Sequence, residues 1–262
     1  MSAFQLEKFG HLAVLTLNSA EKRNLLTPDS ALAIAEAVNQ LRFDINIKAL
    51  AVTGRDDSFC SGADLTCLLQ AASGDGEELQ QIYSAFTSVA QSPLLTIALI
   101  NGPALGAGLN LAMACDIRLA SEQAWFESRF FQLAIHPGGG HTWLLPQLVG
   151  WQQAAAMLFC GERLSATQAL AAGFVKELLP EAELLPRAMQ MTAGLATLPA
   201  ELVRQTKNSL LALRSCYRQD DAVAYEFRQQ FQSLQQEAAQ QHISARLAQL
   251  KNKDSTGKNR HE

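Results

Sequence analysis

The chain has 262 residues, of which 48% are hydrophobic and 18% charged, and it carries a formal net charge of −4. This much apolar material offsets chain entropy on folding, which excludes disorder over most of the length. The negative charge argues against nucleic-acid binding, because there is no excess of lysine and arginine to displace counterions. The length fits one large domain or two small ones, and the low charged fraction predicts apolar contacts between subunits.

The sequence predicts a cytoplasmic protein. Its longest apolar run, residues 94–100, is far shorter than the roughly 18 residues that a membrane span needs, and the first residues do not resemble a signal peptide. The five cysteines are odd in number and include no Cys-x-x-Cys pair, which is typical of reduced thiols. The histidines form no i, i+4 ligand pair, so we expect no metal site.

The first segment predicts two paired strands followed by a helix. Residues 4–17 alternate around Gly10, as strands of a hairpin do. Thr27 and Pro28 are typical of a helix start. The residues that form an apolar stripe on this helix are Ala31, Ile34, Val38 and Leu41.

Strands and helices then alternate. Residues 49–52 and 94–100 are continuous apolar runs, as in strands that are buried on both faces. Residues 77–90 predict a helix between them, and residues 109–114 predict another, followed by a strand at 115–119. This order predicts an α/β core.

The second half is expected to be mostly helical. After a glycine-rich loop at residues 137–140, the pattern from 143 to about 250 is helical. The glutamine-rich residues 229–241 predict one amphipathic helix, whose apolar positions are Phe227, Phe231, Leu234 and Ala238. We therefore expect a core over residues 1–195, a helical region over 196–250, and a polar, disordered tail over 251–262.

Two loops of small residues are candidates for chemistry. Residues 105–110 follow a buried strand, but a dinucleotide loop would need a third glycine where Leu111 stands, and no P-loop lysine follows. A tight turn that opens a helix leaves unpaired N–H groups, and residues 59–65 form a second such turn. Two turns of this kind suit an oxyanion hole with two donors; the alternative is a pair of ordinary strand–helix turns.

Three segments in order, residues 58–65, 100–118 and 161–175, resemble the enoyl-CoA hydratase/isomerase (crotonase) family, and the resemblance extends over about residues 4–250. It implies a crotonase-like spiral of ββα units, with a C-terminal helical region that assembles a homotrimer or a dimer of trimers. It also implies a coenzyme A thioester as substrate, with no further cofactor.

The resemblance implies roles for individual residues. The N–H groups of Ala63 and Ala107 would polarise the thioester carbonyl and stabilise an enolate. Asp64 matches a residue with a largely structural role, which we expect to cap the next helix. The other residues implied in substrate binding are Ser61, Gly62, Leu65, Gly106, Phe130 and Gly138, with Arg23 and Asn24 near the pantetheine and adenosine. Lys207 is a candidate phosphate contact in a neighbouring subunit, or else a solvated helix lysine.

The sequence departs from the family pattern where the hydratases carry two catalytic glutamates. The two positions hold Asn110 and Phe130, neither of which transfers a proton. The acidic residue that an isomerase variant places after Pro137 is also missing, because Gly138 stands there.

Few residues are candidates to replace the glutamates. His136 and His141 flank the glycine loop and titrate near neutral pH. Asn110 would hold a water or a substrate group, and Glu127 would need a local shift of the chain. Cys60 and Cys67 have no neighbouring feature of a nucleophile, so we expect inert thiols.

We therefore predict an acyl-CoA enzyme with an oxyanion hole, non-standard acid–base residues and weak hydratase activity at most. Isomerase, decarboxylase, thioesterase and C–C hydrolase outcomes stay open. The alternative is a catalytically inactive acyl-CoA-binding or scaffold protein. RNA binding, a side function in part of the family, is disfavoured by the lack of a basic patch.

Overall fold

The computed structural model describes residues 3–258, with side chains described as far as residue 250. The chain divides into two units, and the division falls between Ala196 and Thr197 in the sequence. The sequence places this boundary one residue earlier. Along the part of the chain that the structure describes, no helix is long and apolar enough to cross a membrane.

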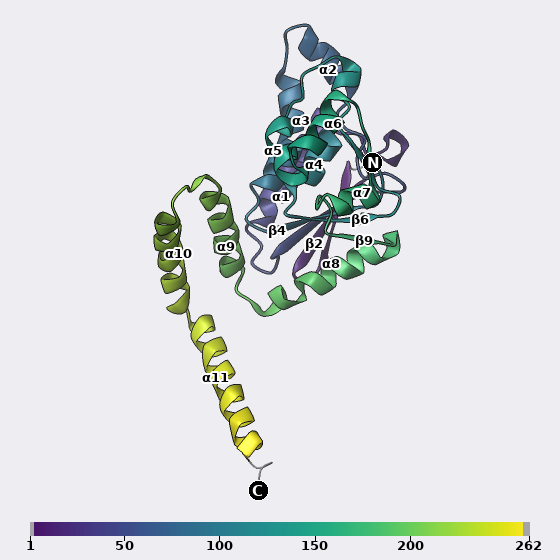
Figure 1. The fold of residues 1–262 in the computed structure, drawn as a ribbon. Coiled ribbons are helices and arrows are strands. Elements are labelled where there is room, and N and C mark those ends of the chain that lie inside the picture. Colours follow the sequence, from purple (N-terminus) through teal and green to yellow (C-terminus); the bar gives the residue numbers. More distant parts are fainter. Residues whose placement is uncertain (1–2, 259–262) are drawn as a thin grey trace. The chain divides into compact units, whose positions relative to one another are not determined.

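A six-stranded sheet is the centre of the first unit (Figure 1). Its first two strands form the predicted antiparallel hairpin, and the remaining neighbours are parallel. In spatial order the strands are β1 (Phe4–Phe9), β2 (Leu12–Leu17), β3 (Ala49–Gly54), β4 (Leu95–Ile100), β6 (Ile117–Ser121) and β9 (Glu177–Leu179).

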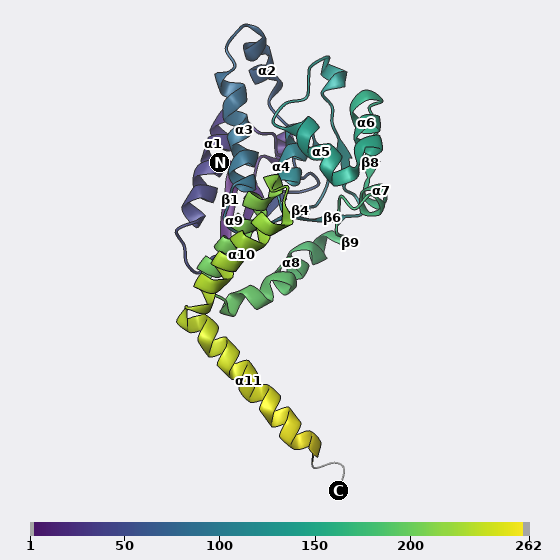
Figure 2. The same cartoon turned by 60° about the vertical axis from the view of Figure 1, so that its left-hand side comes forward.

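Helices cover both faces of this sheet. Successive side chains of a strand point to opposite faces, so Leu12 packs toward α8 (Leu184–Thr192) and Ala13 packs into the larger core on the other face. On that second face, α1 (Pro28–Leu41) and α3 (Glu77–Ala90) lie side by side (Figure 2). Burial on both faces explains why β3 and β4 are apolar without alternation.

The predicted start of α1 is confirmed. The side chain of Thr27 accepts a hydrogen bond from the Ser30 N–H, and the Ser30 hydroxyl accepts one from the Thr27 N–H. Pro28 occupies the first helical position. The four residues of the predicted apolar stripe are all buried.

The first unit also contains a second, three-stranded sheet, and one of its strands leads into the turn before α4. Its strands are β5 (Ala104–Leu105), β7 (Trp125–Glu127) and β8 (Leu164–Ser165). The other helices of the first unit are α2 (Leu65–Ala72), α4 (Ala107–Ala114), α5 (His141–Val149), α6 (Trp151–Phe159) and α7 (Ala166–Ala171). Short 3-10 turns occur at Ala20–Lys22, Phe131–Leu133, Glu181–Glu183, Ala193–Thr197 and Leu213–Ser215.

The sequence missed several short strands. The region beyond residue 143 is not helical throughout, because β8 pairs with β7, and β9 adds a parallel strand to the edge of the large sheet. These strands have two and three residues, which is too short for the alternation of a strand to show in the sequence.

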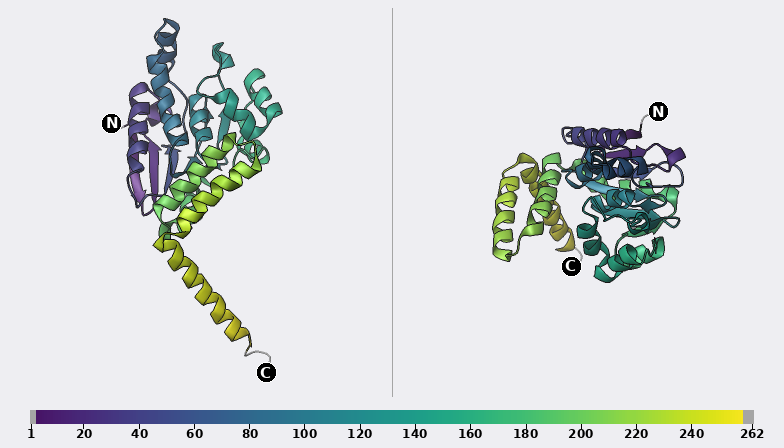
Figure 3. Two further views of the ribbon diagram at one scale, coloured as in Figure 1. Left: turned by 90° about the vertical axis from the view of Figure 1, so that its left-hand side faces the viewer. Right: turned by 90° about the horizontal axis from the view of Figure 1, so that it is seen from above.

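The second unit consists of α9 (Ala200–Ala212), α10 (Gln219–Leu234) and α11 (Glu237–Lys258). Within this unit, α9 and α10 lie side by side (Figure 3). The single amphipathic helix predicted across the glutamine-rich segment is wrong, because the helix ends at Leu234 and another begins at Glu237. The tail expected over residues 251–262 lies at the end of α11: the helical backbone reaches Lys258, and residues 259–262 lie outside the described residues.

Candidate functional site

A cavity of about 570 Å³ lies within the first unit. Side chains from α2 and α3, among them Leu68, Ala71 and Leu79, give it an apolar wall. The turns that precede α2 and α4 and the segment 128–138 border the rest. The cavity is therefore apolar on one side and bordered by exposed backbone on the other, which is typical of a ligand site.

The two turns are held side by side by a short parallel pairing of Cys60 with Ala104. The Cys60 N–H donates to the carbonyl of Pro103 at 3.1 Å, and the Leu105 N–H donates to the carbonyl of Cys60 at 3.0 Å. A Cβ on Gly108 would lie 2.2 Å from the Cys60 carbonyl oxygen, so only glycine allows this approach. The pairing brings the two turns to the same rim of the cavity three residues later, at Ala63 and Ala107.

The N–H of Ala63 points away from Leu26, the residue with which it is paired. Leu26 pairs with this segment by donating to the Gly62 carbonyl at 2.8 Å and accepting from the Asp64 N–H at 3.0 Å. In a parallel pairing the residue between these two bonds directs its own N–H to the opposite side. Within residues 3–258, the Ala63 N–H donates to no protein acceptor, and Ala63 borders the cavity.

Ala107 supplies the second donor. It is the first residue of α4, so its N–H has no partner in the helix. Gly106, which precedes it, has a φ of 50° that favours glycine. A Cβ placed on Gly62 would lie 3.6 Å from the Ala107 nitrogen, so the two turns are in close contact. No acceptor for the Ala107 N–H lies among the described residues either, and two free donors border one cavity.

Asn110, which the sequence resemblance places at the first glutamate position, is fixed by two hydrogen bonds. Its Nδ2 donates to the Gly138 carbonyl at 3.0 Å, and its Oδ1 lies 2.6 Å from Nδ1 of His141. On the other side of the imidazole ring, Nε2 of His141 lies 2.9 Å from the hydroxyl of Ser128. These contacts connect α4, α5 and the segment after β7 in one chain of hydrogen bonds.

His141 is 1% exposed and does not itself border the cavity, but Asn110 and Ser128 do. Phe130 also borders the cavity and packs edge-on against the His141 ring, with centroids 4.9 Å apart. Burial lowers the pKa of His141 to about 4, so the imidazole is neutral at pH 7.

The glycine loop is pressed against the helices beside it. A Cβ on Gly138 would lie 2.2 Å from the Tyr83 hydroxyl, and one on Gly139 would lie 2.7 Å from Nδ2 of Asn110. His136 borders the cavity and donates from Nδ1 to the Pro137 carbonyl at 2.7 Å. The small residues of this loop thus allow close packing around Asn110.

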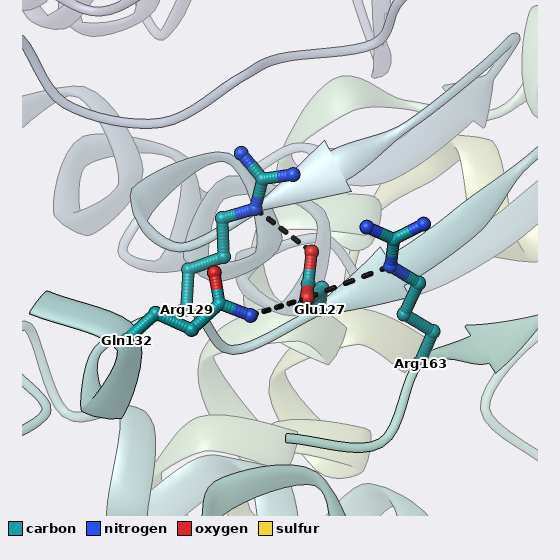
Figure 4. Close-up of polar contacts among 4 residues, drawn as sticks. All are labelled: Glu127, Arg129, Gln132 and Arg163. Atoms are coloured by element: carbon teal, nitrogen blue, oxygen red, sulfur yellow. Dashed lines mark hydrogen bonds and ion pairs between the residues drawn. The ribbon is translucent and has the colours of Figure 1, made fainter.

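Glu127 is held by two arginines and a glutamine (Figure 4). It does not border the cavity. It accepts hydrogen bonds from Arg129 at 2.8 Å and Gln132 at 2.6 Å, and it lies 3.5 Å from Nε of Arg163. Burial alone would raise the pKa of the carboxyl, but the hydrogen bonds and the two arginine charges outweigh it and lower the pKa. The shift of chain that would bring Glu127 to the missing glutamate is therefore not present.

Asn24 fixes the loops and does not border the cavity, so its expected contact with substrate stays a prediction. Its Nδ2 donates to the carbonyls of Arg55 and Ser58, and its Oδ1 accepts from the Ser19 N–H. The side chain of Arg23 is exposed, and its carbonyl accepts from the Ser61 N–H next to the cavity. The backbone of Arg23 is thus close to the cavity border, although Arg23 does not line the cavity.

The structure also describes the surroundings of the other residues that the sequence singled out. Asp64 caps α2, as predicted, by accepting from the N–H and the hydroxyl of Thr66, and these hydrogen bonds lower its pKa. Cys60 and Cys67 are buried, and burial raises the pKa of Cys60 to about 12, so neither thiol is poised for reaction. Lys207 lies on α9 in the second unit.

Ten of the predicted site residues border the cavity: Ser61, Gly62, Ala63, Leu65, Gly106, Ala107, Asn110, Phe130, His136 and Gly138. Sequence reasoning missed Ser128 and Tyr83, which also border it. No sequence signal marks Ser128, because its partner His141 is 13 residues away and the pairing arises from the fold.

The sequence model of the enoyl-CoA hydratase/isomerase family matches residues 7–253. A probable enoyl-CoA hydratase of Mycobacterium tuberculosis is 39% identical over 207 residues, which are 78% of this chain and 80% of that protein. The 1,2-epoxyphenylacetyl-CoA isomerase of Escherichia coli is 33% identical over 203 residues, 74% of this chain and 78% of that protein.

Among solved structures, an enoyl-CoA hydratase from Bacillus anthracis superimposes with a TM-score of 0.85 at 26% identity, covering 94% of this chain and 96% of that one. The predicted fold class, a crotonase-like α/β core followed by C-terminal helices, is confirmed by this likeness and by the family match. The chain belongs to the enoyl-CoA hydratase/isomerase family.

Proposed function

We propose that this protein is an acyl-CoA enzyme that binds the thioester carbonyl oxygen between the N–H groups of Ala63 and Ala107. The observation that carries the proposal is the pair of unpartnered donors at the rim of one cavity. Such donors stabilise the negative charge that develops on the oxygen when a thioester becomes an enolate or is attacked at carbon. The family membership supports the substrate class.

The apolar wall of the cavity suits the acyl group of the substrate. We propose that the coenzyme A portion runs past Ser61 toward Arg23, and that Lys207 is a further phosphate contact in a neighbouring subunit. Coenzyme A would be part of the substrate, and the proposed chemistry needs no other cofactor.

The proton-transfer groups differ from the two glutamates of the family's hydratases. Asn110 and Phe130 hold those positions, and Glu127 is engaged by Arg129 and Arg163. We therefore propose that standard hydration of an enoyl-CoA is weak, and that proton transfer falls to His136 or to the pair of Asn110 and His141. The two relatives are named as a hydratase and an isomerase, so relatives of this chain carry names for more than one reaction.

We also propose that the protein assembles as a homotrimer or dimer of trimers through the helices of the second unit, and that it acts in the cytoplasm. Within that unit, Phe227 and Phe231 on α10 are 63% and 53% exposed and stack at 6.0 Å between ring centroids. Exposed aromatic side chains of this kind favour an interface.

The test is mass spectrometry of products after incubation with a panel of CoA thioesters, repeated with Ala107→Pro and Ala107→Gly. Proline at the first helical position keeps the helix but removes the N–H, whereas glycine keeps the N–H. We expect turnover of at least one thioester, a loss of about 10²–10³ in kcat with proline, and little loss with glycine.

Binding of thioesters without product from any member of the panel would favour the inactive acyl-CoA-binding alternative. Equal turnover by the proline variant would contradict the oxyanion hole. Robust hydration of crotonyl-CoA that is unchanged in Asn110→Asp and His141→Ala would contradict the assignment of the acid–base residues.

A further inference from the structure

Ser128 has the surroundings of an activated nucleophile. It follows β7 directly, borders the cavity and is 2% exposed. The segment before it is joined to the turn that supplies the second donor, because the Gly106 N–H donates to the Glu127 carbonyl at 3.0 Å. A Cβ on Gly106 would lie 3.9 Å from the Ser128 carbonyl oxygen. The serine and the Ala107 donor are therefore neighbours along one wall of the cavity.

The hydrogen bonds around His141 have a fixed direction. Nδ2 of Asn110 donates to the Gly138 carbonyl, so its Oδ1 is the atom that faces the imidazole. Oδ1 only accepts, so Nδ1 of His141 carries the proton and Nε2 carries the lone pair. Nε2 can then accept only from the hydroxyl of Ser128, at 2.9 Å.

We propose that Ser128, His141 and Asn110 are the nucleophile, general base and positioning residue of a thioester hydrolase. The assignment rests on the proposed function, because it uses the N–H groups of Ala63 and Ala107 to hold the oxyanion of the tetrahedral intermediate. A serine, a histidine and a group that orients the histidine, next to an oxyanion hole, are the parts that nucleophilic acyl transfer requires.

The reaction balances with water as the only co-reactant. The Ser128 oxygen bonds to the thioester carbon while its proton passes to Nε2 of His141. The carbon–sulfur bond then breaks, and the coenzyme A thiolate takes the proton from His141. In the second half, His141 accepts a proton from water, the hydroxide adds to the acyl carbon, and the serine oxygen leaves with that proton. The products are a carboxylic acid and free coenzyme A.

The surroundings of His141 favour this role. Among the described residues, the groups that hydrogen-bond to the ring or pack edge-on against it are Asn110, Ser128 and Phe130, none of which is charged. Burial keeps the imidazole neutral at pH 7, so it is available as a base. Asn110 orients the ring without a charge of its own, as the asparagine does in the Cys-His-Asn proteases. Replacing this amide by a carboxylate would stabilise the imidazolium and raise the pKa of His141.

The experiment follows two signals with the full-length protein and the panel of CoA thioesters. The first is release of the coenzyme A thiol, measured with a thiol reagent. The second is the intact mass of the wild-type protein quenched in acid during turnover, with peptide mapping of any adduct. We expect thiol release and one added acyl group on Ser128.

Variants separate a nucleophile from a structural hydroxyl. Ser128→Ala is expected to lose both the adduct and at least 100-fold of thiol release, roughly the loss for one group of an acyl-transfer site. Ser84→Ala is the matched control, because Ser84 bonds only the Gln81 carbonyl on its own helix and does not border the cavity. Asn110→Asp is expected to move the acid limb of the pH profile of thiol release to higher pH, which a merely structural amide would not do.

The wild-type adduct does not depend on the folding of any variant. If a thioester is bound and processed through the Ala107 donor but no adduct forms on Ser128, the nucleophile assignment is overturned while the proposed function stands. Unchanged thiol release in folded Ser128→Ala would overturn it equally. If no thioester of the panel binds, both proposals fail.

Discussion

Oδ1 of Asn110 lies 2.6 Å from Nδ1 of His141, although 31 residues separate them in the sequence. The resemblance of the sequence to the family predicts that this asparagine stands in place of a proton-transferring glutamate. Here the residue orients an imidazole and donates to a loop carbonyl. The pair thus connects the cavity, which Asn110 borders, to a buried imidazole behind it.

The burial of His141 predicts a loss of stability in acid. The folded protein holds this histidine neutral with a pKa near 4, whereas the unfolded chain has the ordinary value of 6.5. Between these values the unfolded state binds more protons, so the free energy of unfolding falls as the pH drops from about 6.5 to about 4. The contribution is about 3 kcal/mol, measured from urea unfolding at several pH values. In His141→Gln this part of the pH dependence should be missing; an unchanged slope would contradict the assignment.

Alanine substitutions at Gly139 and Gly140 test whether the close packing of the glycine loop against Asn110 is required. Both have a positive φ, so alanine at either position costs about 1–2 kcal/mol of backbone strain. Only at Gly139 would the added Cβ meet Phe86 at 2.5 Å and Asn110 at 2.7 Å. Urea unfolding should therefore show a larger loss for Gly139→Ala than for Gly140→Ala, and turnover should fall only in the former. Equal effects would show that the contact with Asn110 is not required.

Glu127 is expected to act in stability and not in proton transfer. Glu127→Gln removes the charge that Arg129 and Arg163 share, at a cost of about 1–2 kcal/mol in the free energy of unfolding. The two arginines are partly exposed and regain water, which limits the loss. Thioester turnover should persist at a temperature where the variant is folded. Abolished turnover in a folded variant would restore Glu127 as a candidate acid or base.

Assembly should depend on the aromatic surface of α10. The double variant Phe227→Glu with Phe231→Glu places charge on this exposed stack and should shift the molar mass from that of a trimer or hexamer to that of a monomer, as measured by light scattering after gel filtration. Gln229→Glu adds charge to the same helix at a half-buried position outside this aromatic stack and should leave the mass unchanged. A wild-type monomer would contradict the proposed assembly.

The elements that sequence predicts well are long and patterned. The stripe from Ala31 to Leu41 and the helix over residues 77–90 are found as expected, because each buries a continuous apolar face. β9 could not be predicted, because three residues show no period and its pairing with β6 is a property of the sheet. The break after Leu234 lies within a run of glutamine that carries no stop signal.

Within the candidate site too, some residues could be predicted from the sequence and others could not. Glycines such as Gly106 and Gly108 mark the turns in the sequence, since the backbone there needs a positive φ or a close approach. Ser128 carries no such mark. Its significance comes from a contact with His141, and that contact depends on how β7 and α5 pack in space.

The most direct test of the oxyanion hole is the carbonyl stretch of a bound CoA thioester labelled with ¹³C at the carbonyl carbon, measured by difference infrared spectroscopy. Polarisation by the Ala63 and Ala107 donors should lower this frequency relative to the free thioester in the wild type and in Ala107→Gly. In Ala107→Pro, saturated with the same thioester, most of the shift should be lost. A bound carbonyl that is shifted equally in all three proteins would contradict the proposed role of the Ala107 N–H.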